Sequence, residues 1–186
     1  MPPKVKITRE EIVRTAVDIV RTGGAQAINA RTIAALLGCS TQPIFSNFDN
    51  MEELRTAVIQ EAASIYRTFT QDIIHSSLYP VYKANGMAYI RFAKEEPELF
   101  KLLFMCDRYG EPIPENDELN TEMVTIVHHN TGLENDEAKL FHLEMWAFVH
   151  GIATMFATGF LDLDWEIVSK MLTDAYLGLK KQYGTE

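Results

Sequence analysis

The chain has few cysteines and no long uninterrupted hydrophobic segment. Its 186 residues include two cysteines, Cys39 and Cys106, which are too few and too far apart for a disulfide framework. We interpret both as small buried residues, with a thiol switch at Cys39 as the alternative. No apolar run reaches the roughly 18 residues of a transmembrane helix, and the N-terminus does not resemble a secretory signal. We therefore expect a cytoplasmic protein with no membrane partner.

Motifs of enzymes and metal sites are also absent. The sequence contains no HExxH, CxxC or GxSxG motif and no glycine-rich phosphate loop. The paired E-x-x-H motifs of helical di-iron sites do not occur, and Asp72 with His75 is the nearest match. His142, Glu144 and His150 share one predicted helix at spacings that do not converge. We expect no enzyme activity, no metal and no cofactor, with a helical metal-binding or catalytic protein as the alternative.

An overall positive charge is missing as well, because the formal net charge is -9. The charge is unevenly distributed along the chain. Up to Phe48 there are six basic and three acidic residues, a net charge of +3, so the remainder carries -12. A basic segment favours contact with phosphate, whereas the acidic remainder is repelled by it. The surplus is small, so we expect modest and salt-dependent affinity for nucleic acid.

Two short predicted helices, joined by a glycine turn, occupy residues 31–54. Asn29 is placed to cap the first helix, and Gly38 permits the left-handed turn that ends it. Ser40 is expected to cap the second helix, which puts Pro43 in the first turn, where a proline is tolerated. The first helix has apolar residues at helical spacing, namely Ile33, Ala34, Leu36 and Leu37. This order is typical of a helix-turn-helix, although any helical hairpin could share it.

The flanking segments also begin with helix-capping patterns. Thr8 with Glu11 forms a capping box that opens a helix ending at Gly23. Asn50 with Glu53 forms a second box, which opens a long helix over residues 51–75. The sequence therefore predicts a three-helix head followed by a long helix.

The order of these features resembles the N-terminal DNA-binding domain of the tetracycline-repressor (TetR) family of bacterial transcription regulators. The resemblance rests on the capped first helix and on the segments RTIAALLGCS, PIFSNF and DNMEEL. It implies a helix-turn-helix DNA-binding domain over residues 1–50 and a helical ligand-binding and dimerisation domain over residues 51–186. The phrases YIRFAKEEPELFKLLF and WAFVHGIATMFATG resemble the body of one branch of the family.

The resemblance also implies which residues face double-stranded operator DNA. It places Arg31 and Thr32 over the backbone, and Gln42 is able to pair with adenine. The chain departs from the family at Phe45, where tyrosine is usual, and at Met51, where lysine is common. Both departures remove a phosphate contact, and Lys4 and Lys6 are candidates for a flexible arm. The predicted contacts are Arg31, Thr32, Ser40, Thr41, Gln42, Pro43, Phe45 and Asn47.

The rest of the chain is predicted to be helical, which makes the fold class all-α with about nine helices. Prolines and glycines divide it into helices over residues 79–96, 97–105, up to 130, 135–158 and 164–182. Residues 111–117, EPIPEND, form the clearest predicted loop. No strand-like alternation stands out.

The last two predicted helices carry more apolar residues than one core-facing side requires. Such a surplus predicts a homodimer interface, with simple burial inside the chain as the alternative. The resemblance implies that these helices pair with their mates about a twofold axis. The predicted interface residues are Phe148, Ile152, Phe156, Val168, Met171, Leu172, Ala175, Tyr176 and Leu179.

Methionines and aromatic residues elsewhere in the helical body are candidates for an inducer pocket. Such side chains adapt to apolar ligands, although most of them are ordinary core residues. The predicted pocket residues are Tyr66, Phe69, Met87, Phe100, Phe104, Met105, Met123, His128 and Met155. We expect a dimeric repressor that a small-molecule ligand releases from its operator. A DNA-binding regulator without a ligand is the alternative.

Overall fold

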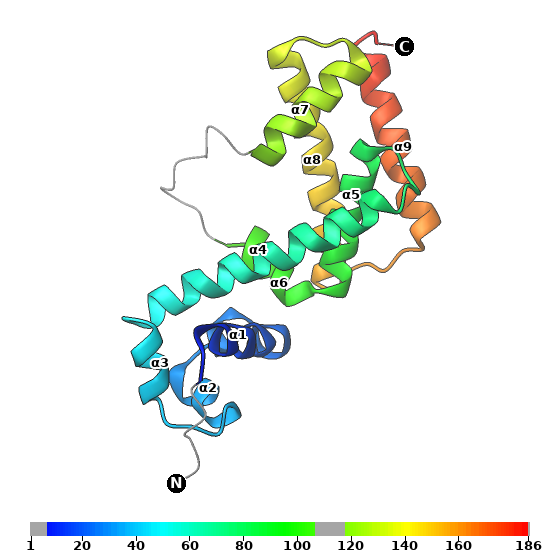
Figure 1. Cartoon of the computed structure of the whole chain (residues 1–186). Coiled ribbons are helices and arrows are strands. Elements are labelled where there is room, and N and C mark those ends of the chain that lie inside the picture. The colour runs from blue at the N-terminus through cyan, green and yellow to red at the C-terminus, as the bar shows by residue number, and fades with distance from the viewer. Residues whose placement is uncertain (1–6, 107–117, 186) are drawn as a thin grey trace. The chain divides into compact units, whose positions relative to one another are not determined.

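The computed structural model describes residues 7–106 and 118–185, and these residues form helices and connecting loops without any strand (Figure 1). The helices are α1 (Arg9–Gly23), α2 (Ala30–Leu36), α3 (Gln42–Asn47), α4 (Met51–His75), α5 (Val81–Glu95), α6 (Pro97–Phe104), α7 (Glu118–Thr131), α8 (Asn135–Ala157) and α9 (Trp165–Gln182), with a short 3₁₀ turn at Ala25–Ala27. The all-α prediction is confirmed, and the predicted helix ends in the body agree within two residues. The predicted loop over residues 111–117 and the predicted arm at Lys4 and Lys6 lie outside the described residues.

Packing divides the described chain into two compact units. The first unit contains the described residues up to Thr68 together with Glu96–Cys106, and the second contains Phe69–Glu95 and the described residues from 118 onward. The boundary falls inside α4, so this helix contributes to both units. The expected domain boundary after residue 50 coincides with the start of α4 and stays a prediction.

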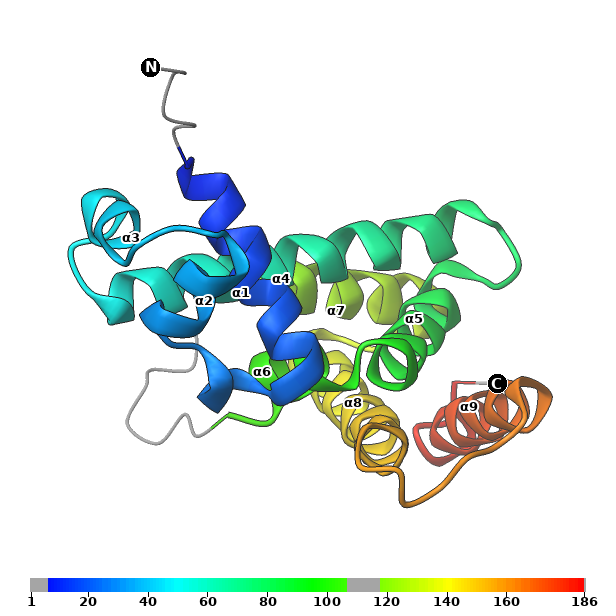
Figure 2. The same cartoon turned by 90° about the horizontal axis from the view of Figure 1, so that it is seen from below.

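In the first unit, α1 packs against α2, α3 and α6 (Figure 2). Thr8 caps α1, because its Oγ1 accepts from the Glu11 amide at 3.2 Å while the Glu11 carboxylate accepts from the Thr8 amide at 2.8 Å. Asn29 caps α2 through the Thr32 amide at 2.9 Å. Both predicted caps are confirmed.

The helices α3 and α4 begin differently from the prediction. Ser40 does not cap α3, because the helix begins at Gln42 and the N-cap position is Thr41. Thr41 has a helical backbone, with φ of -72° and ψ of -12°, and its side chain makes no capping bond. Asn50 does cap α4 by accepting from the amide of Glu53, but the Glu53 carboxylate binds the Asp49 amide rather than that of Asn50.

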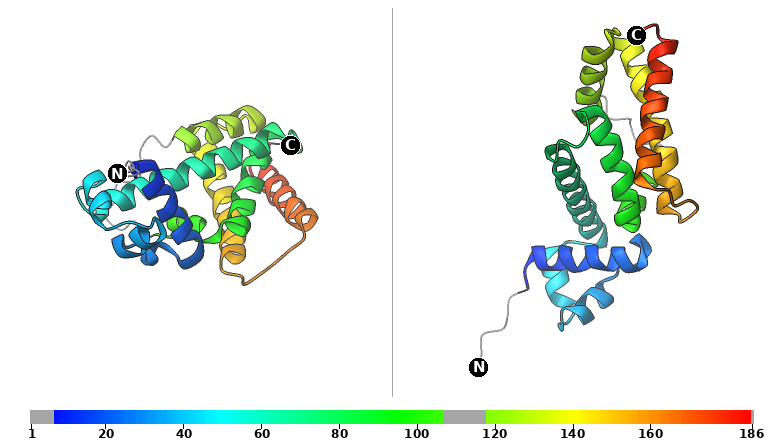
Figure 3. Two further views of the ribbon diagram at one scale, coloured as in Figure 1. Left: turned by 60° about the horizontal axis from the view of Figure 1, so that its bottom comes forward. Right: turned by 90° about the vertical axis from the view of Figure 1, so that its right-hand side faces the viewer.

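In the second unit, α5, α7 and α9 pack against α8 (Figure 3). Gly86 permits a close approach of α5, since a Cβ atom there would lie 3.0 Å from Leu172 Cδ2 and 3.4 Å from Val149 Cγ2. Part of the core consists of Val127, Leu133, Ala138, Phe141 and Met145. Among the described helices, α8 is the one long and apolar enough to cross a membrane, and part of it is buried in this unit.

The two cysteines are less buried than the sequence analysis expects. Cys106 is exposed at the end of α6, and Cys39 is half-buried in the turn after α2. The interpretation of both as buried residues is therefore wrong. Each lies where a helix has ended and packing on the thiol is incomplete.

Candidate nucleic-acid interface and ligand cavity

The turn between α2 and α3 is built as a compact helix-turn-helix. Gly38 adopts a φ of +63°, the left-handed conformation that glycine accepts at low cost. Ile33, Ala34 and Ile44 are buried and join the two short helices to the core of the first unit. The sequence predicts Leu36 on the same apolar face, but its side chain is 64% exposed.

The predicted DNA contacts lie together on the outside of this turn. Arg31, Thr32, Ser40, Gln42 and Phe45 are exposed, whereas Thr41, Pro43 and Asn47 are half-buried. Phe45 is 52% exposed, so its ring is accessible on this surface.

The side chains of two predicted contacts already donate hydrogen bonds to residues three or four positions away in the chain. The Thr32 hydroxyl donates to Asn29 Oδ1 at 3.0 Å, and the Asn47 side-chain amide donates to the carbonyl oxygen of Pro43 at 2.8 Å. Ser46, which the sequence analysis missed, is exposed and donates its hydroxyl to the Gln42 carbonyl at 2.9 Å. Its oxygen can still accept a hydrogen bond from outside.

Arg9 holds the end of α3 against α1 and α4. Its Nη1 donates to the Asn47 carbonyl oxygen at 2.5 Å, and its Nη2 lies 2.8 Å from Glu53 Oε1. The guanidinium also stacks over the Phe48 ring at 4.0 Å. The backbone amide of Asp49 and then Arg9 lower the pKa of Glu53. Sequence reasoning counted Arg9 only as a charge, because no local pattern indicates a contact between residues 9 and 47.

The second unit contains a cavity of about 450 Å³ between α5, α7, α8 and α9. This volume falls in the range of roughly 300–1,000 Å³ that is typical of small-molecule sites. Most of the lining is apolar or aromatic. The lining residues are Pro80, Tyr82, Lys83, Asn85, Gly86, Tyr89, Met123, Asn130, His142, Met145, Trp146, Val149, Leu172, Thr173, Tyr176 and Leu177.

Polar groups of the cavity lie mainly on α5 and on the helices facing it. Lys83 Nζ donates to Thr173 Oγ1 at 2.8 Å, which joins α5 to α9. The Tyr82 hydroxyl and His142 Nδ1 are 3.0 Å apart and join α5 to α8. Burial raises the pKa of Tyr82, so this phenol stays neutral near pH 7. The cavity thus combines an apolar surface with a few fixed polar groups, as ligand sites do.

The predicted pocket residues lie elsewhere, with one exception. Met123 lines the cavity, but the other eight do not. Tyr66, Phe100, Phe104 and Met105 belong to the first unit, where the rings of Tyr66 and Phe104 pack at 5.1 Å. The Phe100 and Phe104 rings also pack on each other, with centroids 5.2 Å apart. A ligand role for these four residues stays a prediction.

The remaining four predicted pocket residues serve other roles in the second unit. Phe69 packs on Phe92 at 5.5 Å, and Met87 is fully buried. His128 donates from Nδ1 to the Leu133 carbonyl oxygen at 2.6 Å, near the end of α7. Met155 is 39% exposed on α8.

The predicted dimer residues divide into buried and accessible groups. Ile152, Phe156, Val168 and Leu172 are at most 7% exposed inside the single chain, and Ala175, Tyr176 and Leu179 pack against its core. Leu172 and Tyr176 also line the cavity. Phe148 is 37% exposed and Met171 is half-buried, so they keep surface that a partner can cover. Four of the nine predicted interface residues are thus buried within the single chain, and the interface itself stays a prediction.

An exposed helix-turn-helix followed by a helical unit with a cavity is typical of small ligand-responsive transcription regulators. Comparison with family models gives a match to the tetracyclin repressor-like C-terminal domain over residues 82–175, just over half of the chain. The chain belongs to the TetR family of DNA-binding transcriptional regulators.

Solved structures with this fold include two that cover nearly the whole chain. A protein of unknown function from Rhodococcus sp. RHA1 superposes with a TM-score of 0.73 and 20% identity, covering 98% of both chains. A TetR-like transcriptional regulator from Rhodococcus sp. RHA1 superposes with a TM-score of 0.67 and 14% identity, covering 95% of this chain and 96% of that one. No curated protein matches the sequence.

Proposed function

We propose that the protein is a cytoplasmic, homodimeric repressor that binds double-stranded operator DNA and is released from it by a small molecule. The observation that carries this proposal is the presence of an exposed helix-turn-helix and a cavity of about 450 Å³ in one chain of a regulator family. Either feature alone would leave one half of the proposal without a site.

The DNA-reading surface is proposed to be the exposed side of α2 and α3. Arg31 contacts phosphate at the start of α2, and Gln42 reads a base edge from the start of α3. Phe45 packs against the sugar backbone, where its ring adds apolar contact but no hydrogen bond. Arg9 supports this surface from behind by fixing the C-terminal end of α3.

The dimer interface is proposed to include the outward side of α8. Leu140, Leu143, Phe148 and Met155 share this side and are 49%, 56%, 37% and 39% exposed. The opposite side of α8 faces the core of its own chain, so the helix is apolar on two sides. A second copy would cover the outward side, and a twofold dimer presents two recognition helices to one operator.

A charge placed on this side of α8 tests the interface. We expect Leu143→Glu to convert the dimer to a monomer in sedimentation equilibrium at micromolar concentration, because each twofold contact would bury two carboxylates. Leu78→Glu is the matched control, since Leu78 is 69% exposed outside α8. A dimer that survives Leu143→Glu, or a wild-type chain that is already monomeric, would contradict the proposed interface.

Release of DNA requires that the ligand bind the DNA-incompetent state better than the competent one. α4 is the continuous helix that enters both units, so it is the element proposed to couple them. We propose that ligand binding moves α4 and spreads the two heads away from the spacing of the operator.

Selection of bound sequences from a random DNA pool, followed by a screen of small molecules for release, tests the whole proposal. Val149→Phe supplies the matched variant, since Val149 lines the cavity and a larger side chain would occupy part of it. We expect this variant to bind the selected DNA like the wild type and to lose the response to a releasing compound. Equal release of both proteins would place the ligand outside this cavity.

A further inference from the structure

The lining of the cavity carries one formal charge, and that charge is positive. Lys83 is the only lysine or arginine among the lining residues, and none of them is an aspartate or a glutamate. The protein as a whole is acidic, with a net charge of -9. The cavity therefore has the opposite electrostatic preference from the rest of the chain.

We propose that the cavity binds an apolar carboxylic acid with an aromatic body, whose carboxylate pairs with the Lys83 ammonium. This inference rests on the proposed function, because it names the chemical class of the releasing ligand. A carboxylate is the simplest group that satisfies an ammonium in an apolar site, and a planar ring suits the aromatic lining.

A hydrogen bond to Thr173 positions the Lys83 ammonium and uses one of its three N–H donors. One N–H donates to Thr173 Oγ1 at 2.8 Å, while the Thr173 hydroxyl donates to the Ser169 carbonyl at 3.0 Å. This order makes Thr173 an acceptor toward Lys83. An ammonium has three N–H donors, and no carboxylate of the described residues lies within ion-pair distance of this one.

Acidic residues on neighbouring helices are engaged elsewhere. Asp174, which follows Thr173 on α9, pairs with Lys170 at 2.5 Å. Glu144 on α8 accepts from the Tyr183 hydroxyl at 3.1 Å. Because these carboxylates face other partners, an acid arriving in the cavity meets Lys83 without a competing intramolecular anion.

The rest of the lining suits an aromatic body. Tyr89, Trp146 and Tyr176 supply rings, and Met145 supplies an adaptable thioether. The Trp146 ring is fixed by stacking on His150, with centroids 5.0 Å apart and planes 18° apart. Burial raises the pKa of Tyr176, so its phenol adds no negative charge near neutral pH. A cationic ligand would find an ammonium here and no carboxylate to balance it.

The test compares acids with their neutral and cationic analogues by calorimetric titration of the full chain. The probes are 2-naphthoate with 2-naphthamide and 2-naphthylmethylamine, and indole-3-acetate with indole-3-acetamide. We expect at least one acid to bind roughly 10- to 100-fold more tightly than its amide, the size of a charge-assisted hydrogen bond in an apolar site. Lys83→Met should reduce the affinity for the acid to that of the amide.

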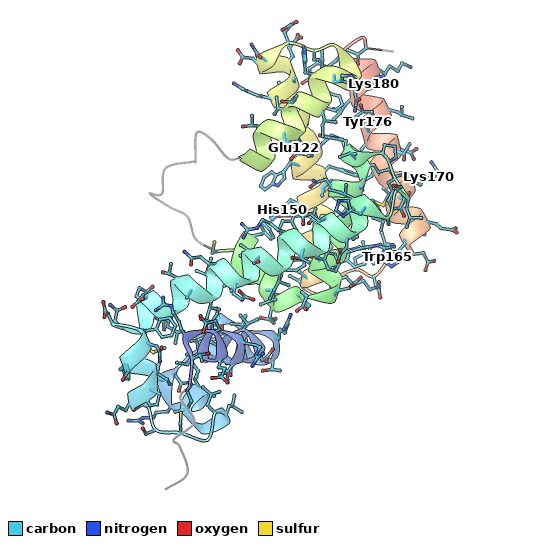
Figure 4. The ribbon with its side chains drawn as sticks, viewed as in Figure 1. Glu122, His150, Trp165, Lys170, Tyr176 and Lys180 are labelled. Atoms are coloured by element: carbon cyan, nitrogen blue, oxygen red, sulfur yellow. The ribbon has the colours of Figure 1, made fainter. Side chains whose placement is uncertain are left out.

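Lys170→Met is the matched control, because Lys170 lies on the outer side of the same helix that carries Tyr176 (Figure 4) and its side chain is 74% exposed. It should leave the binding of acids unchanged. If Lys83→Met does not fold, the comparison of acid with amide on the wild type still decides. Equal binding of acid and amide, tighter binding of the amine, or no binding of any acid at millimolar concentration overturns the inference.

Binding of an acid and release of DNA are measured separately, so the ligand class and the proposed function can each be contradicted without the other. An acid that binds through Lys83 but does not release DNA contradicts the proposed function and leaves the ligand class standing. A neutral compound that binds the cavity and releases DNA, while the acids do not bind, contradicts the ligand class alone.

Discussion

Replacing Arg9 by methionine should loosen the recognition helix while the rest of the head stays folded. Methionine keeps much of the aliphatic stem but removes the bond to the Asn47 carbonyl and the stack on Phe48. Buried hydrogen bonds to charged groups contribute about 1.5–3 kcal/mol, and exposed cation–π contacts about 0.5–1 kcal/mol. The Arg9 side chain is 41% exposed, which reduces both contributions. We expect a loss of about 1–2 kcal/mol, with nothing added for the solvent-screened ion pair to Glu53.

Amide hydrogen exchange in α3 measures this loss directly. A local loss of that size accelerates exchange of the Phe48 amide, which donates to the Ile44 carbonyl at 3.0 Å, by roughly 5- to 30-fold. Arg14→Met is the matched control, because Arg14 is exposed on the same helix. Equal exchange rates in the wild type and the Arg9 variant would refute the role of Arg9 as the support of α3. Faster exchange throughout α1 would instead indicate global destabilisation.

Three further predictions concern DNA affinity and pH. Phe45→Tyr combined with Met51→Lys should tighten DNA binding across sequences and steepen its salt dependence by about one to two units, measured by titration at two salt concentrations; unchanged affinity would show that neither position faces phosphate. The pKa of Glu53 is lowered, so its contribution is present above the usual glutamate pKa and is lost as the pH falls through the lower folded value. Glu53→Gln should therefore make the free energy of unfolding, measured by urea titration, decline less between about pH 5 and pH 3. An unaltered decline would contradict the depressed pKa of Glu53. Burial lowers the pKa of His150, so the unfolded chain binds the proton more readily and stability should fall as the pH drops below about 6.5. His150→Gln should reduce the difference between the free energies of unfolding measured with urea at about pH 5.5 and pH 7.5. An identical difference would contradict the lowered pKa of His150.

The head could be predicted largely from local sequence signals. Caps at Thr8, Asn29 and Asn50 and the turn at Gly38 depend on residues within three or four positions of each other. The misplaced cap at Ser40 shows where this reasoning ends. Thr41 takes a helical backbone without a capping side chain, and nothing nearby in the sequence indicates that choice.

The cavity could not be located in the same way. The chemistry of methionine and aromatic residues suits a ligand pocket, yet Phe69 packs on Phe92 and Phe104 packs on Tyr66. Lys83 carries no sequence signal of a site, because a single lysine in a helix is ordinary until its neighbours are known. Its significance comes from Thr173, which lies 90 positions away in the sequence.

The sequence by itself determined the all-helical class, the order of the helices and the helix-turn-helix, because caps, turns and helical periodicity are local properties of the chain. Tertiary structure decided which apolar faces are filled and which remain open. It buried Val168 and Leu172 in the chain's own core, left Leu143 on the surface, and set Lys83 beside an apolar cavity. Packing between helices distant in sequence governs those outcomes, since an apolar residue carries no local mark of the partner that will cover it.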